Sequence, residues 1–529
     1  TMRNSRSPNQ LMFDGFETEF EKWLEPDNRW VLLSQAIPWE ELSVAYEMSL
    51  SAHTGRPAKD GRLVIGAVII KHKLCLSDEE TIEQIRENPY LQYFVGFTAF
   101  HKEQAFAPSL FVEIRRRMGP RVFAHFEDSI ITRLAEKPEA SADDDDRTTP
   151  PAEGGEAVPC DGATPAYPAS ADPAPPTHQG KLIVDATVVE QAIRYPTDLS
   201  LLNEAREISE QIIDTLHPLT GVEKKVRTYR RNARKDYLAL VKQRRPGNKK
   251  ARKAIGQQLR YLKRNLGHIE AMLDVRPGQE IPLPHKQLRQ YWVISHLYLQ
   301  QKQMFDSRTR RCDDRIVSIH QPHVRPIIRG KQNKPVEFGA KLGVSLSGDG
   351  IVCVDNLSWD AYHEGHDLPD QVEAFHKRHG HYPEKLLADP LYGTRENRDY
   401  LKEKGIRFAG KPLGRPPKMS SAEDTINRRQ RQQDYRERIP IEGKFGQGKN
   451  GYDLNYIRAR TSKTSEAWIR SIFLVMNLLV LLRFLFVRVL THTGHHVAAV
   501  LEAQIHWFHT ITTRQTDKLK QSPLLEMAF

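Results

Sequence analysis

The chain has 529 residues, more than one ordinary hydrophobic core organises, so we expect about three structural units. Its 78 lysines and arginines outnumber its 67 acidic residues and give a net charge of +11, which indicates a polyanionic partner, nucleic acid first. The first residues lack an apolar signal core, so we expect a cytoplasmic protein. The cysteines contain no C-x2-C pair, which argues against a zinc ribbon and a disulfide framework: Cys75, Cys160, Cys312 and Cys353.

Residues 1–135 are predicted to form a helical domain. From about residue 39 the apolar residues recur at helical spacing, and Ser77 precedes an acidic turn as a helix cap does. Short helices that end in a basic run suit a helix-turn-helix-like DNA-binding domain, with Arg115, Arg116 and Arg117 as contacts. The alternative is a small helical bundle with a solvated basic face.

Residues 136–180 change abruptly to proline, alanine, glycine and acid, with four consecutive aspartates at 143–146. This composition buries too little apolar surface to fold, so we expect a disordered linker. The linker is either a plain spacer or an acidic segment that competes with DNA for basic faces.

An apolar run, Leu182 to Val184, predicts a buried strand that continues through Asp185 to residue 189. A carboxylate in such a strand is costly unless it is paired or bound to a metal. Asp185 is therefore a candidate site residue, with backbone N–H groups as the alternative partners of its carboxylate.

Residues 199–305 are predicted to form a helical insertion. Between Gly221 and Asn265 there are 17 lysines and arginines against two acids, an excess of one sign that repels itself unless phosphates neutralise it. We interpret it as a DNA-binding patch; a solvated helical hairpin used for dimerisation is the alternative. Trp292 and the apolar residues after it are expected to return to the core. The contacts chosen in the patch are Arg230, Arg231, Arg234 and Lys235.

Shorter periodicity follows from about residue 315. Strands are expected at 317–320 and on both sides of the Gly348 to Gly350 turn, and then a helix at 368–378. A short strand at 385–388 ends on Asp389, at the edge of a sheet where ligand sites gather. Thr394 is expected to start a helix, and residues 406–409 to form the last strand.

The segment from 434 to 453 places Tyr435, Arg438, Glu442 and Lys449 within roughly a 60° arc if it is one helix. A carboxylate among cations suits a divalent metal beside a phosphodiester, and a solvated charged face is the alternative. Pro440 predicts either a kink or the start of a new helix, and the glycines after it leave the helical state of Lys449 open.

Two flanking segments complete the chain. Gly414-Arg415-Pro416 has the pattern of an arm whose arginine enters the DNA minor groove, and a proline-rich linker is the alternative. Residues 472–487 are strongly apolar but short for a membrane span, so we expect a buried helix. Residues 491–529 form a tail of low information.

The pattern Y-x2-R-x3-E-x6-K, present as Tyr435, Arg438, Glu442 and Lys449, resembles the signature of bacterial insertion-sequence DDE transposases with RNase H-like cores. The stretches after Asp185 (YPTDLSLLNEARE) and at Asp389 (DPLYGTREN), and the N-terminal helices, are similar to the same group. One position departs: many relatives have glycine where Leu391 follows Asp389 by two residues, which puts the loop conformation in question.

The resemblance implies an α/β RNase H-like catalytic core at 181–490 with the helical insertion, preceded by an all-α N-terminal DNA-binding domain. It implies an Asp185, Asp389 and Glu442 triad that holds two Mg²⁺ or Mn²⁺ ions. The expected reaction cleaves DNA at the terminal inverted repeats of the element and joins the ends to target DNA. Tyr435, Arg438, Lys444 and Lys449 are expected to hold the DNA, and the protein to act as a homodimer or larger assembly without a membrane.

Two other functions remain compatible with the residues. An RNase H-like nuclease specific for DNA structure would cut without joining, and a domesticated DNA-binding protein would do neither. Terminal-repeat DNA that binds no better than random duplex would favour either of them.

Overall fold

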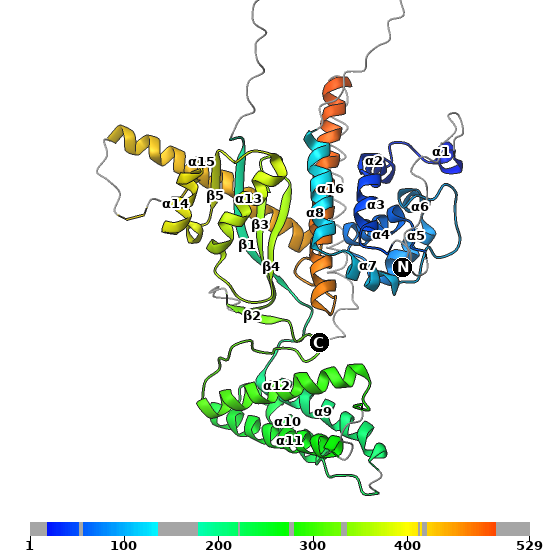
Figure 1. The fold of residues 1–529 in the computed structure, drawn as a ribbon, viewed down its shortest axis with the longest axis vertical. Helices are drawn as coiled ribbons and strands as arrows, with labels where there is room; N and C mark the ends of the chain where they lie inside the picture. The colour runs from blue at the N-terminus through cyan, green and yellow to red at the C-terminus, as the bar shows by residue number, and fades with distance from the viewer. Residues whose placement is uncertain are drawn as a thin grey trace, which may run out of the picture.

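The computed structural model describes residues 18–51, 57–135, 178–220, 223–274, 280–328, 336–410, 413–414 and 421–493 (Figure 1). The predicted linker lies outside the described residues except for positions 178–180, and so do Arg415 and the tail from residue 494.

The described N-terminal residues form helices. Polar caps set their starts: the Asp60 carboxylate accepts from the Arg62 and Leu63 N–H groups, and the predicted cap Ser77 accepts from the Glu80 N–H group. Apolar faces turn inward from several of these helices, and the fourth is buried along almost its whole length. The elements are α1 (Glu19–Trp23), α2 (Arg29–Ala36), α3 (Trp39–Glu47), α4 (Gly61–Lys73), α5 (Asp78–Glu87), α6 (Pro89–Phe94), α7 (Leu110–Arg117) and α8 (Pro120–Ala135).

A mixed sheet forms the centre of the second half of the chain. Its order is β2-β3-β1-β5-β6, with β4 paired to β3; β1 runs antiparallel to β3 and parallel to β5. The strands are β1 (Lys181–Glu190), β2 (Arg325–Ile328), β3 (Val336–Ser347), β4 (Val352–Ser358), β5 (Lys385–Ala388) and β6 (Arg407–Ala409).

The strand expected at 317–320 is wrong. The edge strand is β2, and residues 316–319 instead bury Ile316 and Ile319 in the core of the helical insertion. Their apolar side chains therefore pack in the helical insertion and not against the sheet. The other predicted strands are confirmed within one or two residues.

Alternation along β1 decides which helices its side chains meet. Leu182 and Val184 pack with α13 (Leu368–His379) and α14 (Arg395–Glu403), whereas Ile183 and Val189 join the core that contains α15 (Ser421–Gly451) and α16 (Ser462–Thr493). Asp185 belongs to the second set by its spacing of two from Ile183. It therefore points to the face that α15 covers.

Helix α16 runs between the N-terminal helices and the sheet (Figure 1). Ser462–Leu485 is long and apolar enough to cross a membrane by length and composition, and 61% of its most apolar window is buried inside the protein. Asn477 interrupts the apolar run because its amide bonds both backbone groups of Val352, at 2.9 and 2.8 Å. The prediction of a buried helix is confirmed.

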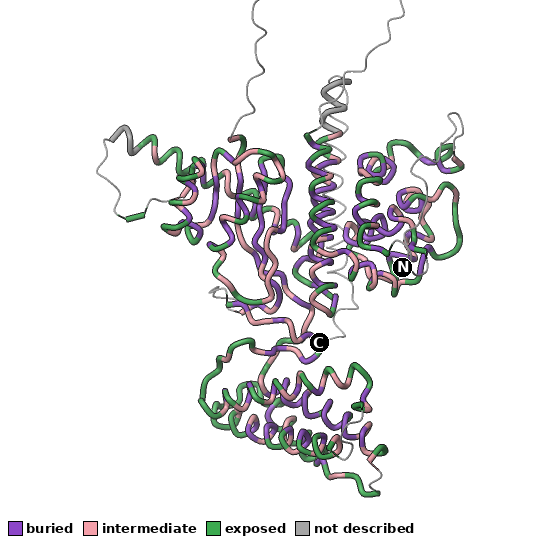
Figure 2. Tube along the Cα trace, in the orientation of Figure 1, coloured by how far each residue is buried: buried purple, intermediate pink, exposed green. Residues whose placement is uncertain are grey.

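The insertion folds around a hydrophobic core of its own (Figure 2). It comprises α9 (Asp198–Leu216), the short helix η1 (His217–Leu219), α10 (Arg230–Val241), α11 (Asn248–Asp274) and α12 (His285–Ser307). The expectation that Trp292 returns to the core is wrong: it lies on the outer face of α12 with 59% of its surface exposed. The chain reaches the sheet again only at β2.

Candidate active site

Two acidic residues lie side by side where β1 and β5 meet. Val184 pairs with Ala388 in the parallel register, so the next residues, Asp185 and Asp389, occupy neighbouring positions on strands about 4.8 Å apart. The Asp185 carboxylate accepts from the Ala186 N–H group at 2.8 Å, and that of Asp389 accepts from the Leu391 N–H group at 3.0 Å. Leu391 is absent from the residues with positive φ, so the loop needs no glycine there.

Ion pairs fix helix α15 across the sheet. The first residues of three adjacent strands, β1, β5 and β6, are register partners and form a row of cations across the sheet: Lys181, Lys385 and Arg407. Glu437 pairs with Lys385 at 2.7 Å and lies 3.6 Å from Lys181, and Asp434 accepts two hydrogen bonds from Arg407. The sequence analysis missed this row, although a cation ahead of each short apolar strand is a readable signal.

The arginine of the signature bridges two carboxylates. Arg438 Nη2 donates to Glu442 Oε1 at 2.7 Å, and its Nη1 lies 3.6 Å from Asp185 Oδ2. The Glu442 side chain is 52% exposed, whereas those of Arg438 and Asp185 are each 17% exposed. The structure thus places Asp185 and Asp389 on neighbouring strands and links Glu442 to Asp185 through the Arg438 guanidinium.

Helix α15 continues without interruption from Ser421 through Pro440 to Gly451. Of the two expectations at Pro440, the start of a new helix is wrong, because packing supports the helix beyond the proline: Ile441 and Phe445 are buried, and a Cβ on Gly448 would lie 2.9 Å from Leu454 Cδ2. The kink stays a prediction. All four residues of the signature, Lys449 included, therefore belong to one helix.

The Asp185 carboxyl is electrostatically unusual. Burial raises its pKa to about 6; the Ala186 N–H group and the Arg438 charge act in the opposite direction, and the nearby Asp389 and Glu364 charges raise it further. An anion that is costly to bury favours a cation beside it. This environment is typical of a functional carboxyl rather than a solvated one.

Glu364 is a candidate site residue that the sequence analysis missed. It precedes α13 and pairs with Lys341 of β3 at 2.9 Å, and Lys341 also donates to the Tyr362 carbonyl oxygen at 2.8 Å. Tyr392, in the turn after Asp389, buries a hydroxyl with no hydrogen-bond partner among the described residues. Burial, and then the charges of Glu364 and Asp185, raise the Tyr392 pKa. No spacing in the sequence marked either residue.

The donor set fits a hard divalent cation, since its oxygens are carboxylates and a positive guanidinium already lies between Asp185 and Glu442. Within the described ranges, no three His, Cys, Asp or Glu side chains are placed together closely enough to hold an ion. Glu442 would have to turn from Arg438 toward the two aspartates, and its side chain is 52% exposed.

The other predicted contacts around the signature differ in placement. The Tyr435 side chain is exposed beside Arg438. Lys444 instead lines a pocket with Pro440 and Arg483 against α16, and burial followed by the Arg483 charge lowers its pKa. It lies two residues from Glu442, on another side of the helix.

The N-terminal arginine cluster is not one basic face. Arg115 is 6% exposed and makes two hydrogen bonds to the Asp78 carboxylate, at 2.9 and 2.6 Å, so the prediction that it contacts DNA from an exposed surface is wrong. Asp78 lies 37 residues earlier, which hides this pairing from local pattern. Arg116 pairs with Glu113 at 2.6 Å, and Arg117 hydrogen-bonds Tyr46.

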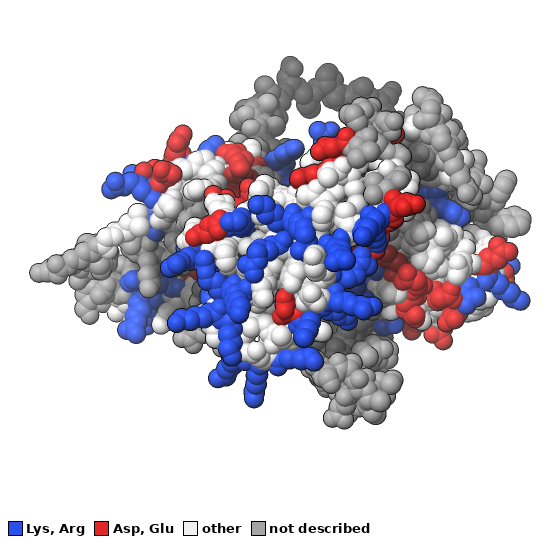
Figure 3. Space-filling model, turned by 90° about the horizontal axis from the view of Figure 1, so that it is seen from below, with Lys and Arg blue, Asp and Glu red and all other residues white. Residues whose placement is uncertain are grey.

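The insertion carries a broad basic surface. Viewed from below, Lys and Arg side chains crowd the molecule's lower face (Figure 3), and α10 and α11 supply many exposed ones. Arg231, Arg234 and Lys235 are exposed, and none of the described residues forms an ion pair with them. Arg230 differs, because it donates to Asp214 at 2.8 Å and to Thr228 at 3.4 Å.

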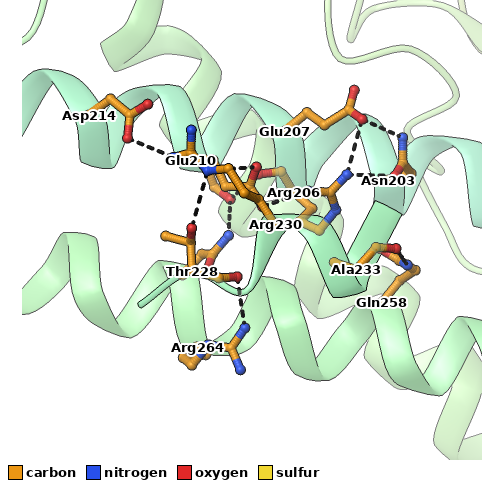
Figure 4. Close-up of polar contacts among 12 residues, drawn as sticks. Asn203, Arg206, Glu207, Glu210, Asp214, Thr228, Arg230, Ala233, Gln258 and Arg264 are labelled. Atoms are coloured by element: carbon orange, nitrogen blue, oxygen red, sulfur yellow. Dashed lines mark hydrogen bonds and ion pairs between the residues drawn. The ribbon is translucent and has the colours of Figure 1, made fainter. Parts of the chain in front are cut away.

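Arg230 belongs to a polar network that joins the insertion helices (Figure 4). In its middle, Arg206 of α9 is fully buried and bonds Glu210 at 2.5 Å and Asn203 at 2.8 Å. Arg264 of α11 donates to the Thr228 carbonyl oxygen at 3.0 Å. Arg206 and Asn203, which lie in the segment YPTDLSLLNEARE, thus help to hold the helices of the insertion together.

Comparisons with known proteins agree with the two halves of this architecture. A family model described as Transposase domain (DUF772) matches residues 18–117, and one described as Transposase DDE domain matches residues 386–479, a range that includes Asp389 and Glu442. An uncharacterised protein of Rhizobium meliloti, ORF8 in the nfe locus, is 37% identical over 120 residues, which are 23% of this chain and 57% of that protein. The chain thus spans little more than half of that relative's length. No solved structure matches the chain.

Proposed function

The chain belongs to the DDE transposases, and we propose that it binds the terminal inverted repeats of an insertion sequence, cleaves DNA at the element ends and joins them to target DNA. The observation that carries this proposal is the adjacency of Asp185 and Asp389 on parallel strands beneath the helix that bears Glu442. Residues 1–135 are the proposed DNA-binding domain, 136–180 a linker, 181–490 the catalytic core and 491–529 a tail.

The strand order supports an RNase H-like core. Three antiparallel strands, β4, β3 and β1, continue into the parallel β5 and β6. The insertion at 199–305 leaves this sheet after β1 and returns at β2, so it adds a separate helical layer without interrupting the strands that carry the aspartates.

Asp185, Asp389 and Glu442 are the proposed ligands of two Mg²⁺ or Mn²⁺ ions, which would polarise the nucleophile and stabilise the leaving oxygen of the phosphodiester. When Glu442 turns toward the aspartates, Arg438 loses one of its two carboxylate partners, and its freed N–H groups can donate to a DNA phosphate. Tyr435 and Lys449 lie on the same helix and would hold the strand in register.

The nuclease and the inactive DNA-binding protein remain the rival functions. The exposed cations of α10 and α11 favour a protein that holds long DNA, which a simple nuclease does not need. The raised pKa of Asp185 favours catalysis over binding alone.

The test is Mg²⁺-dependent nicking and joining of a duplex that carries the element ends, with wild type, Glu442→Gln and the control Glu403→Gln. Glu403 is an exposed glutamate on α14, away from the carboxylates. We expect wild type and the control to nick and join and Glu442→Gln to do neither. Nicking without joining would establish the nuclease, and binding with no reaction in wild type would establish the inactive protein.

A further inference from the structure

A cationic cavity lies where the N-terminal helices meet the start of α16. Its volume is about 610 Å³, and its walls come from α4, α5 and α7 on one side and from residues 458–468 on the other. The two sides belong to the two regions that match separate transposase families. Asp185, Asp389 and Glu442 are not among its lining residues.

The charges of the cavity are unbalanced. Asp78 is already held between Lys71, at 2.9 Å, and Arg115, at 2.6 Å. Arg458 and Arg460 are exposed at the opposite wall, and neither forms an ion pair with any described residue. Glu79 is the other acid of the wall, so four cations face two carboxylates.

The first turn of α16 adds to this positive potential. Thr461 caps the helix, accepting from the Thr464 N–H group at 3.4 Å, and both threonines line the cavity. A helix start concentrates N–H groups that lack intrahelical acceptors and carries the positive end of the helix dipole. Anions, and phosphates in particular, bind at such ends.

Two buried donors in the wall have no acceptor among the residues that the structure describes. They are Trp468 Nε1, in a residue that is 8% exposed, and Arg115 Nε. Buried N–H groups normally find an acceptor, so these two donors would gain from an acceptor that enters the cavity. Two positive charges lie beside the Trp468 indole. Lys71 Nζ is 4.6 Å from its ring centroid, and the Arg115 guanidinium carbon is 5.2 Å from it.

We propose that this cavity binds a phosphate group, through Arg458, Arg460, the start of α16 and the Trp468 indole N–H. The ligand is either a backbone phosphate of DNA, which rests on the proposed function, or a small free phosphate. The cavity is tied to the strand of Asp185, because Ile457 donates to the Glu190 carbonyl oxygen at 3.1 Å and accepts from the Ala192 N–H group at 2.9 Å. A bound phosphate therefore joins the N-terminal helices to the catalytic sheet.

The first arm of the test is calorimetric titration of the full chain with inorganic phosphate. Arg460→Gln removes a cation, and Trp468→Phe removes the N–H donor while keeping a ring in the core. Each is expected to weaken phosphate binding about 10-fold, the loss of one hydrogen bond to a charged group. Arg121→Gln, an exposed cation of α8 that does not line the cavity, is the matched control and should bind as wild type does.

The second arm separates the two sources of phosphate by the salt dependence of binding to a random duplex. If the cavity holds a DNA phosphate, Arg458→Gln with Arg460→Gln lowers the slope of log K against log salt concentration by about 1. An unchanged slope with weakened inorganic phosphate binding assigns the cavity to a small phosphate. The proposal fails if the slope is unchanged and inorganic phosphate binds wild type and variants equally or binds none of them.

These arms do not use the triad. If wild type neither nicks nor joins the element ends, the proposed function fails, and the phosphate titration still tests the proposed cavity site by itself. Thermal unfolding of Trp468→Phe checks that the variant is folded before its binding is compared.

Discussion

Cations around α15 and cations on α10 and α11 are the same residue types put to different uses. At α15, Lys385 and Arg407 each pair with a carboxylate of that helix, and Arg438 pairs with Glu442 of the helix and with Asp185 of β1. On α10, Arg231 and Arg234 face solvent with no ion pair to a described residue. Paired cations position the protein's own elements, whereas unpaired cations remain available for DNA phosphates.

The largest effect should come from removing a carboxylate next to the paired cations at α15. Asp185→Asn keeps the shape of the side chain but loses the charge, and we expect nicking to fall about 1000-fold, the equivalent of about 4 kcal/mol of transition-state stabilisation. The rate of Mg²⁺-dependent nicking measures it, with DNA affinity as the control. Retention of more than a tenth of the wild-type rate would remove Asp185 from the proposed triad.

The same residue predicts a pH dependence of folding without metal. Its folded pKa, about 6, lies above the ordinary value of about 3.9, so the native state binds the proton more tightly than the unfolded state does. This carboxyl therefore destabilises the fold above pH 6, and the free energy of unfolding gains about 2–3 kcal/mol as pH falls from 7 to 4. The difference between wild type and Asp185→Asn in urea unfolding with EDTA isolates it, and parallel pH profiles would contradict it.

The unpaired cations of α10 are tested by the salt dependence of duplex binding. Replacing Arg231, Arg234 and Lys235 by Gln should weaken duplex binding about 10- to 100-fold at 0.1 M salt and reduce the slope against log salt by about 2 to 3. Arg230→Gln is the matched control, because Asp214 already holds that guanidinium. Equal slope changes from Arg230 and from one of its exposed neighbours would erase the distinction between paired and unpaired cations.

Sequence periodicity was sufficient for elements whose signals are local. The strand through Asp185, the short strand before Asp389 and the caps Ser77 and Thr394 all lie within a few residues of their determinants. That the two aspartates belong to one site was expected only from the family resemblance, because no local signal shows that β1 and β5 pair in parallel.

What could not be predicted depends on residues far apart in the chain. Arg115 is buried because its guanidinium hydrogen-bonds the Asp78 carboxylate, 37 residues earlier. Ile316 and Ile319 pack in the hydrophobic core of the insertion instead of the sheet. Glu364 approaches Asp185 only through the turn before α13. The new helix start that proline propensity allowed at Pro440 does not form, since burial of Ile441 and Phe445 against α16 outweighs a lost backbone hydrogen bond.

The ion pairs that dock α15 predict a smaller effect with a clear rescue. Arg407→Asp places a like charge beside Asp434, and we expect joining to fall about 10-fold because the helix shifts relative to Asp185. The reversed pair, Arg407→Asp with Asp434→Arg, should recover most of the rate. A double variant no better than the single one would mean that the pair does not set the helix position.

The smallest effect is expected at Pro440, also on α15. Its ring leaves the Arg436 carbonyl oxygen without the usual N–H donor, and Pro440→Ala restores that donor at an exposed position of an already continuous helix. We expect a gain of about 1–3 kcal/mol in the free energy of unfolding and less than about a twofold change in joining rate. A large loss of joining would instead show that a proline-induced bend is needed to bring Glu442 to the aspartates, so that the local break suggested by the sequence has a catalytic purpose.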